Sequence, residues 1–217
     1  NSMMAQDVVP SRLEKSKLLI ENLVDHFTHD RIGLVVFAGD AFVQLPITTD
    51  YVSAKMFLQN IDPALIATQG TDIAKAINLS MRSFSQQKDI GKAVIVITDG
   101  EDHEGGALEA AKAANERGIR VFILGIGSTK GSPIPLAEGG YLTDRSGQTV
   151  LTALNESMCK QIAQAGNGTY IHVDNTNDAQ EKLNNELAKL QRADTQAVIY
   201  SEYGEQFQAV CIIVIIL

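Results

Sequence analysis

Apolar residues follow two alternating patterns along this chain, one typical of buried strands and the other of amphipathic helices. Runs rich in β-branched residues with few polar interruptions predict strands covered on both faces, at 31–38, 93–97, 120–126 and 169–173. Segments with apolar side chains at helical spacing predict helices at 10–26, 51–61, 71–84, 107–118, 155–165 and 178–190. Strands that alternate with helices in this way indicate a parallel sheet between two helical layers.

The expected fold class is therefore α/β, a doubly wound and mostly parallel sheet flanked by helices. Two features depart from strict alternation. Residues 41–45 read as a short antiparallel edge strand that pairs with 31–38 across Gly39-Asp40 and is closed by Pro46. Residues 141–150 follow a Gly/Pro-rich loop and predict a small inserted hairpin that turns at Ser146-Gly147.

The alternation of strands and helices does not continue into the last 26 residues. Residues 192–208 are polar and predict a tether, so we expect one domain over residues 1–191. Residues 209–217 are nine apolar residues in a row, too few to cross a bilayer, which takes about 20. We expect this run to be the start of a truncated transmembrane helix. A core strand is the alternative, because the run is rich in β-branched residues.

Composition narrows the class of partner. The chain has 217 residues, 45% of them hydrophobic, which is enough for one sizeable core. Its 18 Lys and Arg against 26 Asp and Glu give a net charge of −8, with no basic run, so nucleic acid is not an expected partner. The two cysteines, Cys159 and Cys211, do not form a disulfide framework.

Three residues with oxygen-bearing side chains stand where a ligand site is expected. Asp99 follows a buried strand, and the crevice beyond the carboxyl ends of such strands is where open α/β sheets bind ligands. Ser2 and Thr71 add two hydroxyls, and hydroxyls and carboxylates are hard ligands suited to Mg²⁺. As alternatives, Asp99 before Gly100 suits a plain turn, and Thr71 with Asp72 suits a helix cap.

At these residues the chain resembles the von Willebrand factor A family. The family's metal-ion-dependent adhesion site has the pattern Asp-x-Ser-x-Ser, then a distant Thr, then a distant Asp. Asn1-Ser2-Met3 resembles the end of the first element, Gly70-Thr71 the second, and Thr98-Asp99-Gly100 the third. The chain begins after the family's first Asp and first Ser, so we expect the domain to lack its first, central strand and the start of the metal motif.

The resemblance implies a cofactor and a mode of binding. A divalent cation, Mg²⁺ or else Mn²⁺ or Ca²⁺, would be held by Ser2, Thr71 and Asp99, and a protein partner would offer a carboxylate to its open position. Without the first Asp, this chain could also lack the metal. Asp7, Asp72, Glu101 and Asp102 are expected at the rim of the site, with solvated loop charge as the alternative.

Within the family the chain resembles the bacterial Bat proteins of aerotolerance operons. The supporting phrases are residues 1–13, 36–41, 45–48 and 97–103. The resemblance implies anchoring in the bacterial inner membrane through a C-terminal helix, with the domain on the periplasmic side. It also implies a role in oxygen tolerance or complex assembly, with other domains of this type, a tetratricopeptide-repeat protein and a MoxR-type AAA ATPase as partners.

The alternative function is catalytic. Asp99 with a metal-bound water could hydrolyse an ester or phosphate, with Glu101, Asp102 and His103 as the acid/base set. No nucleophile elbow accompanies these residues, which favours a binding module over an enzyme. Gly125-Ile126-Gly127 resembles part of a dinucleotide fingerprint, but no helix can start cleanly in the residues that follow, which predicts a plain loop.

Overall fold

The centre of the computed structural model is a six-stranded sheet with the strand order β2-β1-β8-β3-β4-β7. The structure describes residues 2–65, 68, 70–85, 90–102, 104–136, 138–198 and 210–216. The antiparallel pair β1–β2 forms one side, and the remaining pairs are parallel. The strands are β1 (Arg31–Phe37), β2 (Ala41–Thr48), β3 (Lys92–Thr98), β4 (Ile119–Ile126), β7 (Tyr170–Val173) and β8 (Val210–Ile216). The predicted fold class is confirmed.

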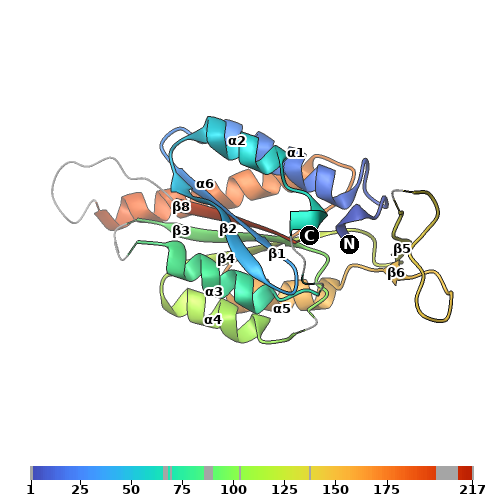
Figure 1. The fold of residues 1–217 in the computed structure, drawn as a ribbon. Helices are drawn as coiled ribbons and strands as arrows, with labels where there is room; N and C mark the ends of the chain where they lie inside the picture. The colour runs from blue at the N-terminus through green and yellow to red at the C-terminus, as the bar shows by residue number, and fades with distance from the viewer. Residues whose placement is uncertain are drawn as a thin grey trace.

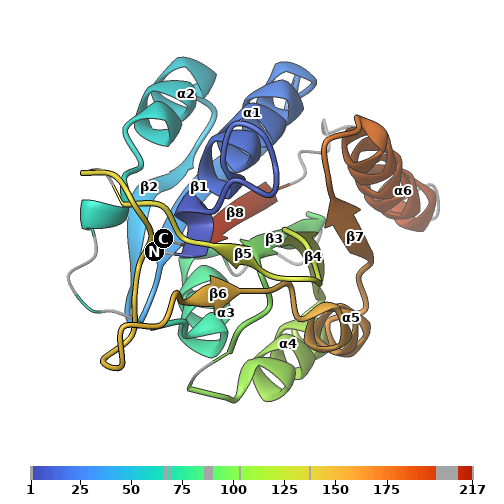
Figure 2. The same ribbon diagram turned by 90° about the vertical axis from the view of Figure 1, so that its right-hand side faces the viewer.

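Helices cover both faces of this sheet (Figure 2). One layer contains α1 (Arg12–Asp25), α2 (Tyr51–Gln59) and α6 (Asp178–Val198), and the other contains α3 (Ile73–Ser83), α4 (Ala107–Glu116) and α5 (Glu156–Ala165). The inner strands are apolar along their whole length because they have helices on both sides; Val94, Val96 and Ile97 have no exposed surface.

The expectation of a truncated transmembrane helix at 209–217 is corrected by the structure. Residues 210–216 form β8, which lies between β1 and β3 and pairs with both in parallel (Figure 1). A run of β-branched residues suits this place, because the central strand of the sheet is buried on both faces and Ile213, Val214 and Ile215 have no exposed surface. Residues 210–216 therefore fill the central position of the sheet, where no strand was expected.

Two further boundaries differ from prediction. Helix α6 continues to Val198, so 192–198 is helix and not tether, while 199–209 lies outside the described residues. Strand β2 extends through Pro46 to Thr48, which an edge strand permits because one side of it needs no hydrogen bonds. No helix among the described residues combines the length and apolar character needed to cross a membrane.

The inserted segment between β4 and α5 is longer than a simple hairpin. It contains the two-residue strands β5 (Ser132–Pro133) and β6 (Leu151–Thr152), which pair antiparallel. Within it, the predicted turn at Ser146-Gly147 is bridged by the Thr143–Thr149 pair. Figure 1 shows this segment projecting beyond the sheet on the side where the short 3-10 helix η1 (Ser2–Met4) lies.

Candidate functional site

The three predicted metal ligands belong to the same region of the molecule, the carboxyl edge of the sheet. Asp99 follows β3 directly, and Thr71 precedes α3. The backbone N–H of Asp72 donates to the carbonyl of Ala38, 2.8 Å away, which fixes the Thr71 segment beside the end of β1. Ser2 lies in η1, which packs on α1 near the carboxyl end of β8 (Figures 1 and 2).

The turn after β3 is built around Asp99 by local constraints. The Gly100 N–H donates to Thr98 Oγ1 at 3.0 Å, and the Asn155 N–H donates to the Asp99 carbonyl at 2.7 Å. Gly100 has a φ of +74°, and a Cβ there would lie 2.6 Å from both the Asn155 carbonyl and Cys159 Sγ. Glycine is therefore required at this position, and the turn holds the Asp99 side chain at the sheet edge.

The Asp99 carboxylate is fully buried yet only loosely contacted. Its Oδ2 lies 3.3 Å from Arg12 Nη1 and 3.4 Å from Thr152 Oγ1, and its Oδ1 accepts from the Glu101 N–H at 3.3 Å. Charge-assisted hydrogen bonds to a carboxylate are ordinarily near 2.7–2.9 Å. Asp99 therefore retains capacity for a further, closer positive charge.

Asp7 has the opposite character, because its contacts are short. Its Oδ1 and Oδ2 accept from Arg12 Nε at 2.9 Å and from Arg12 Nη2 at 2.7 Å, and Oδ2 also accepts from the Ser128 N–H at 2.7 Å. Burial alone would raise the pKa of Asp7, but the bonds from Arg12 and Ser128 outweigh it and hold that pKa below the ordinary 3.8. Asp7 is thus a fixed anion beside Asp99.

Two other predicted rim residues form a second group, between α3 and α4. Asp72 is the N-cap of α3 and accepts from the Lys75 N–H at 2.7 Å. Asp102 is surrounded by the backbone N–H groups of Ala107, Gly105 and Ile73. Burial raises the pKa of Asp102, and these N–H groups oppose that shift without cancelling it. Asp72 caps the N-terminus of α3, so for this residue the capping alternative is confirmed, whereas the Oδ1 atom of Asp102 is buried without a hydrogen-bond partner among the described residues.

The fourth rim residue, Glu101, joins the first group. Thr152 Oγ1 lies 3.3 Å from Glu101 Oε1. Sequence reasoning missed Thr152 and, above all, Arg12, a fully buried cation that contacts Asp7, Asp99 and Thr152. One signal was present: a basic residue in the first turn of a helix opposes the helix dipole, so Arg12 needs a specific acidic partner.

The structure brings Asp7, Asp99 and Glu101 together through Arg12 and Thr152. Within the part of the chain that is described, no hydrogen bond or ion pair joins the Ser2 or Thr71 side chain to Asp99, and no three acidic, His or Cys side chains form a metal cluster. Their assignment as ligands therefore stays a prediction. His103, of the alternative catalytic set, lies outside the described residues.

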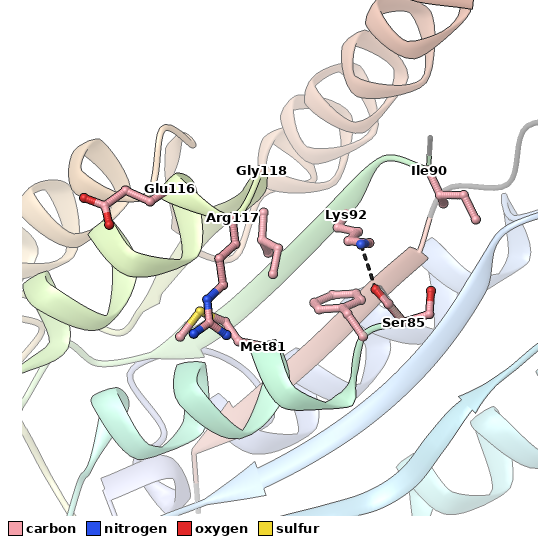
Figure 3. Close-up of a pocket in the computed structure, with 9 residues that line it drawn as sticks. Met81, Ser85, Ile90, Lys92, Glu116, Arg117 and Gly118 are labelled. Carbon is pink, nitrogen blue, oxygen red and sulfur yellow. Dashed lines mark hydrogen bonds between the residues drawn. The ribbon is translucent and has the colours of Figure 1, made fainter. Parts of the chain in front are cut away.

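A cavity of about 660 Å³ lies at the opposite edge of the sheet (Figure 3). It is lined in part by Lys92, Arg117 and Glu116, and Lys92 Nζ donates to the Ser85 carbonyl at 2.8 Å. Burial lowers the pKa of Lys92. Lys92 and Thr98 are the two ends of β3, about 20 Å apart at strand spacing, so this cavity is separate from the Asp99 region.

Comparison with known proteins supports the resemblance found in the sequence. The model of the von Willebrand factor type A domain matches residues 5–186. The structure of BatB from Bacteroides thetaiotaomicron is 57% identical, with a TM-score of 0.86, and the match covers 88% of this chain and 94% of that one. An aerotolerance-related membrane protein from Bacteroides fragilis is also 57% identical, with a TM-score of 0.84, over 87% and 94% of the two chains.

More distant relatives are longer than this chain. A UPF0353 protein of Mycolicibacterium paratuberculosis is 24% identical over 204 residues, which are 88% of this chain and 56% of that protein. The chain spans 36% of a relative from Borreliella burgdorferi. Given the sheet, the turn that holds Asp99 and these similarities, the chain belongs to the von Willebrand factor type A family, in which it is similar over most of its length to BatB.

Proposed function

We propose that the carboxyl edge of the sheet is a metal-dependent protein-binding site. The observation that carries the proposal is the Asp99 carboxylate, which has no exposed surface and whose side-chain contacts are all 3.3 Å or longer. Burying a carboxylate is costly unless positive charge compensates it closely, so the donor set fits a divalent cation. The hydroxyls of Ser2 and Thr71 are suitable further ligands, since Mg²⁺, Mn²⁺ and Ca²⁺ prefer hard oxygen donors.

Each residue of the edge has a definite task in this proposal. When bound, the cation supplies an open coordination position that attracts a carboxylate of the partner protein. Asp99 is the principal charged ligand, and its turn keeps it in place. Asp7, Asp72, Glu101 and Asp102 form an acidic rim that favours a cation at the edge and disfavours anionic surfaces that offer no ligand to it.

A binding role is better supported than hydrolysis. Asp102, an acid/base candidate, is surrounded by helix N-terminal N–H groups of α3 and α4. The nearby thiol of Cys159 is buried, and burial raises its pKa to about 12, which makes it a poor nucleophile. Family membership points the same way, so we propose that this chain is not an enzyme.

The partners that we propose come from the similarity to Bat proteins. They are other domains of this type, a tetratricopeptide-repeat protein and a MoxR-type AAA ATPase, in complexes connected with oxygen tolerance. Because a similar Bacteroides fragilis protein is described as a membrane protein, we propose the inner membrane as the location, with the domain on its periplasmic side. Direct binding of the purified ATPase that requires Mg²⁺ and is lost in Asp99→Ala would support this assignment.

The metal site itself is tested by titration with Mn²⁺, which reports on both binding and the open position. Wild-type protein should bind Mn²⁺ in calorimetry, and addition of N-acetyl-aspartate amide should lower the water proton relaxivity of the bound ion by displacing water. Asp99→Asn should lose both signals. Glu116→Gln, at the exposed end of α4 beside the cavity at the opposite edge, removes the same charge far from Asp99 and should keep them. Equal Mn²⁺ affinity in wild type and Asp99→Asn would refute the proposal.

A further inference from the structure

Arg12 occupies an unusual position for a cation. It is the first residue of α1, it has no exposed surface, and it lies at the positive end of the helix dipole. Burial of an arginine there is costly unless acidic groups compensate its charge, and two carboxylates do so, Asp7 and Asp99.

The guanidinium uses its full donor capacity in this cluster. An arginine has five N–H donors, and five contacts are found. Two are the short bonds to Asp7, at 2.9 and 2.7 Å. Two go to Thr152, with its Oγ1 and its carbonyl oxygen each 3.1 Å away. The fifth is the long contact to Asp99, at 3.3 Å.

The surrounding backbone holds the guanidinium in that orientation. Gly127 has a φ of +112°, and a Cβ at this residue would lie 2.5 Å from Arg12 Nε. The next residue, Ser128, donates its N–H to the same Asp7 oxygen that accepts from Arg12 Nη2. The loop after β4 therefore encloses the Arg12–Asp7 pair, and Asp7 draws the guanidinium away from Asp99.

We infer that Arg12 is a built-in cation that competes with a divalent metal for Asp99, and that Asp7 sets the strength of this competition. The inference rests on the proposed function of the edge. Two cations that share one buried carboxylate repel each other strongly in a low-dielectric site. Metal binding at Asp99 is therefore weakened by Arg12, and it is permitted because Asp7 leaves Arg12 with only a long contact to Asp99.

The experiment measures Mn²⁺ affinity by calorimetry, with the thermal unfolding temperature of the metal-free protein as a second readout. Arg12→Gln should bind Mn²⁺ on the order of tenfold more tightly than wild type, and its metal-free form should unfold at a lower temperature. Arg145→Gln removes the same charge from an exposed position in the inserted segment and should leave the affinity unchanged.

Asp7→Asn separates the competition from a general effect of acidity. Without the Asp7 charge, Arg12 is compensated by Asp99 alone, so Mn²⁺ affinity should fall. In the Arg12→Gln background the same Asp7→Asn change should lower the affinity less than it does in wild type, because its route through Arg12 is gone and only its part in the acidic rim remains. If Arg12→Gln alone does not fold, the variant that carries both Arg12→Gln and Asp7→Asn tests the competition. It should bind Mn²⁺ more tightly than Asp7→Asn.

The outcomes distinguish this inference from the proposed function. If wild type binds Mn²⁺ and Thr71→Ala does not, while folded Arg12→Gln binds no more tightly than wild type, the competition is refuted and the metal site stands. If neither wild type nor folded Arg12→Gln binds Mn²⁺, both are refuted. Binding by Arg12→Gln but not by wild type would support the competition and refute the role given to Asp7, which is to permit metal binding in wild type.

Discussion

Gly127 illustrates how closely the backbone is fitted around one buried guanidinium. Its φ of +112° is in the range that favours glycine, and the space where a Cβ would stand is occupied by the Arg12 side chain. A side chain at residue 127 would have to displace a cation that is bound to two carboxylates. The glycine is therefore part of the site, although it contacts no ligand.

We predict that Gly127→Ala destabilises the protein by about 2–4 kcal/mol, the sum of backbone strain and a disturbed buried ion pair. The measurement is the free energy of unfolding in urea. Gly147→Ala is the matched control, because Gly147 also has a positive φ, +80°, but nothing lies within 4 Å of its Cβ position. It should cost about 1 kcal/mol. Equal losses in the two variants would show that the Arg12 contact has no energetic weight.

At this scale the sequence predicted the acidic residues better than their partners. Asp99 was found because a buried strand ends there, a property of local pattern. The link from Asp99 to Arg12 spans 87 positions, and the link from Arg12 to Thr152 spans 140. Such contacts depend on how the elements pack, which no periodicity encodes. For the same reason the sequence did not show whether the Asp72 side chain lies at the rim of the site or caps a helix. In the structure it caps the N-terminus of α3.

Among the elements, β8 lies at the centre of the sheet, between β1 and β3. It pairs with β1 and β3 over nearly its whole length and is covered by helices on both faces. Edge strand β2 pairs with β1 alone and has partly exposed side chains, with 38% of Val43 exposed. Val214 in β8 and Val43 in β2 therefore have the same side chain but differ in burial.

We predict that Val214→Ala, in β8, lowers the free energy of unfolding by about 2–3 kcal/mol, because it leaves a cavity at a position with no exposed surface. Val43→Ala removes the same two methyl groups at the edge, where solvent fills the gap, and should cost less than about 1 kcal/mol. Urea unfolding of both variants measures the difference. Equal effects would contradict a central place for β8.

The composition of 210–216 could not reveal this role by itself. A short run of Val, Ile and Cys suits a central strand and the beginning of a membrane helix equally, because both environments exclude water along the whole segment. The helices and the other strands of the main sheet were predictable, since each helix shows a helical spacing of apolar residues and each strand an apolar run of strand length. The neighbours of β8 precede it by most of the chain, and its pairing register is a long-range property.

For the molecule as a whole, the net charge of −8 and the burial of acidic groups make stability depend on pH. The pKa of Asp7 is below 3.8 in the folded protein, so its stabilising contribution is complete above the unfolded value of 3.8 and is lost as the pH falls through the folded value. Asp144 has a pKa lowered by Ser146, but it is exposed and contributes less.

We predict that the thermal unfolding temperature falls as the pH is reduced from about 5 to about 3, and that Asp7→Asn makes this fall smaller. The variant should also be less stable than wild type at neutral pH, because Arg12 loses its closest counter-charge. Asp144→Asn should change the pH dependence less. A pH profile of Asp7→Asn that is parallel to that of wild type would show that Asp7 does not titrate differently in the two states.

The place of β8 also determines the order in which the molecule can be assembled. During synthesis, β1–β2 and β3–β4–β7 are complete before β8 leaves the ribosome, yet β1 and β3 each have a side that pairs with β8 in the described sheet. Strand edges of this kind pair readily with other chains. The nascent protein is thus two unfinished half-sheets that must be kept apart from other copies, and its last described strand closes the sheet in a single late step.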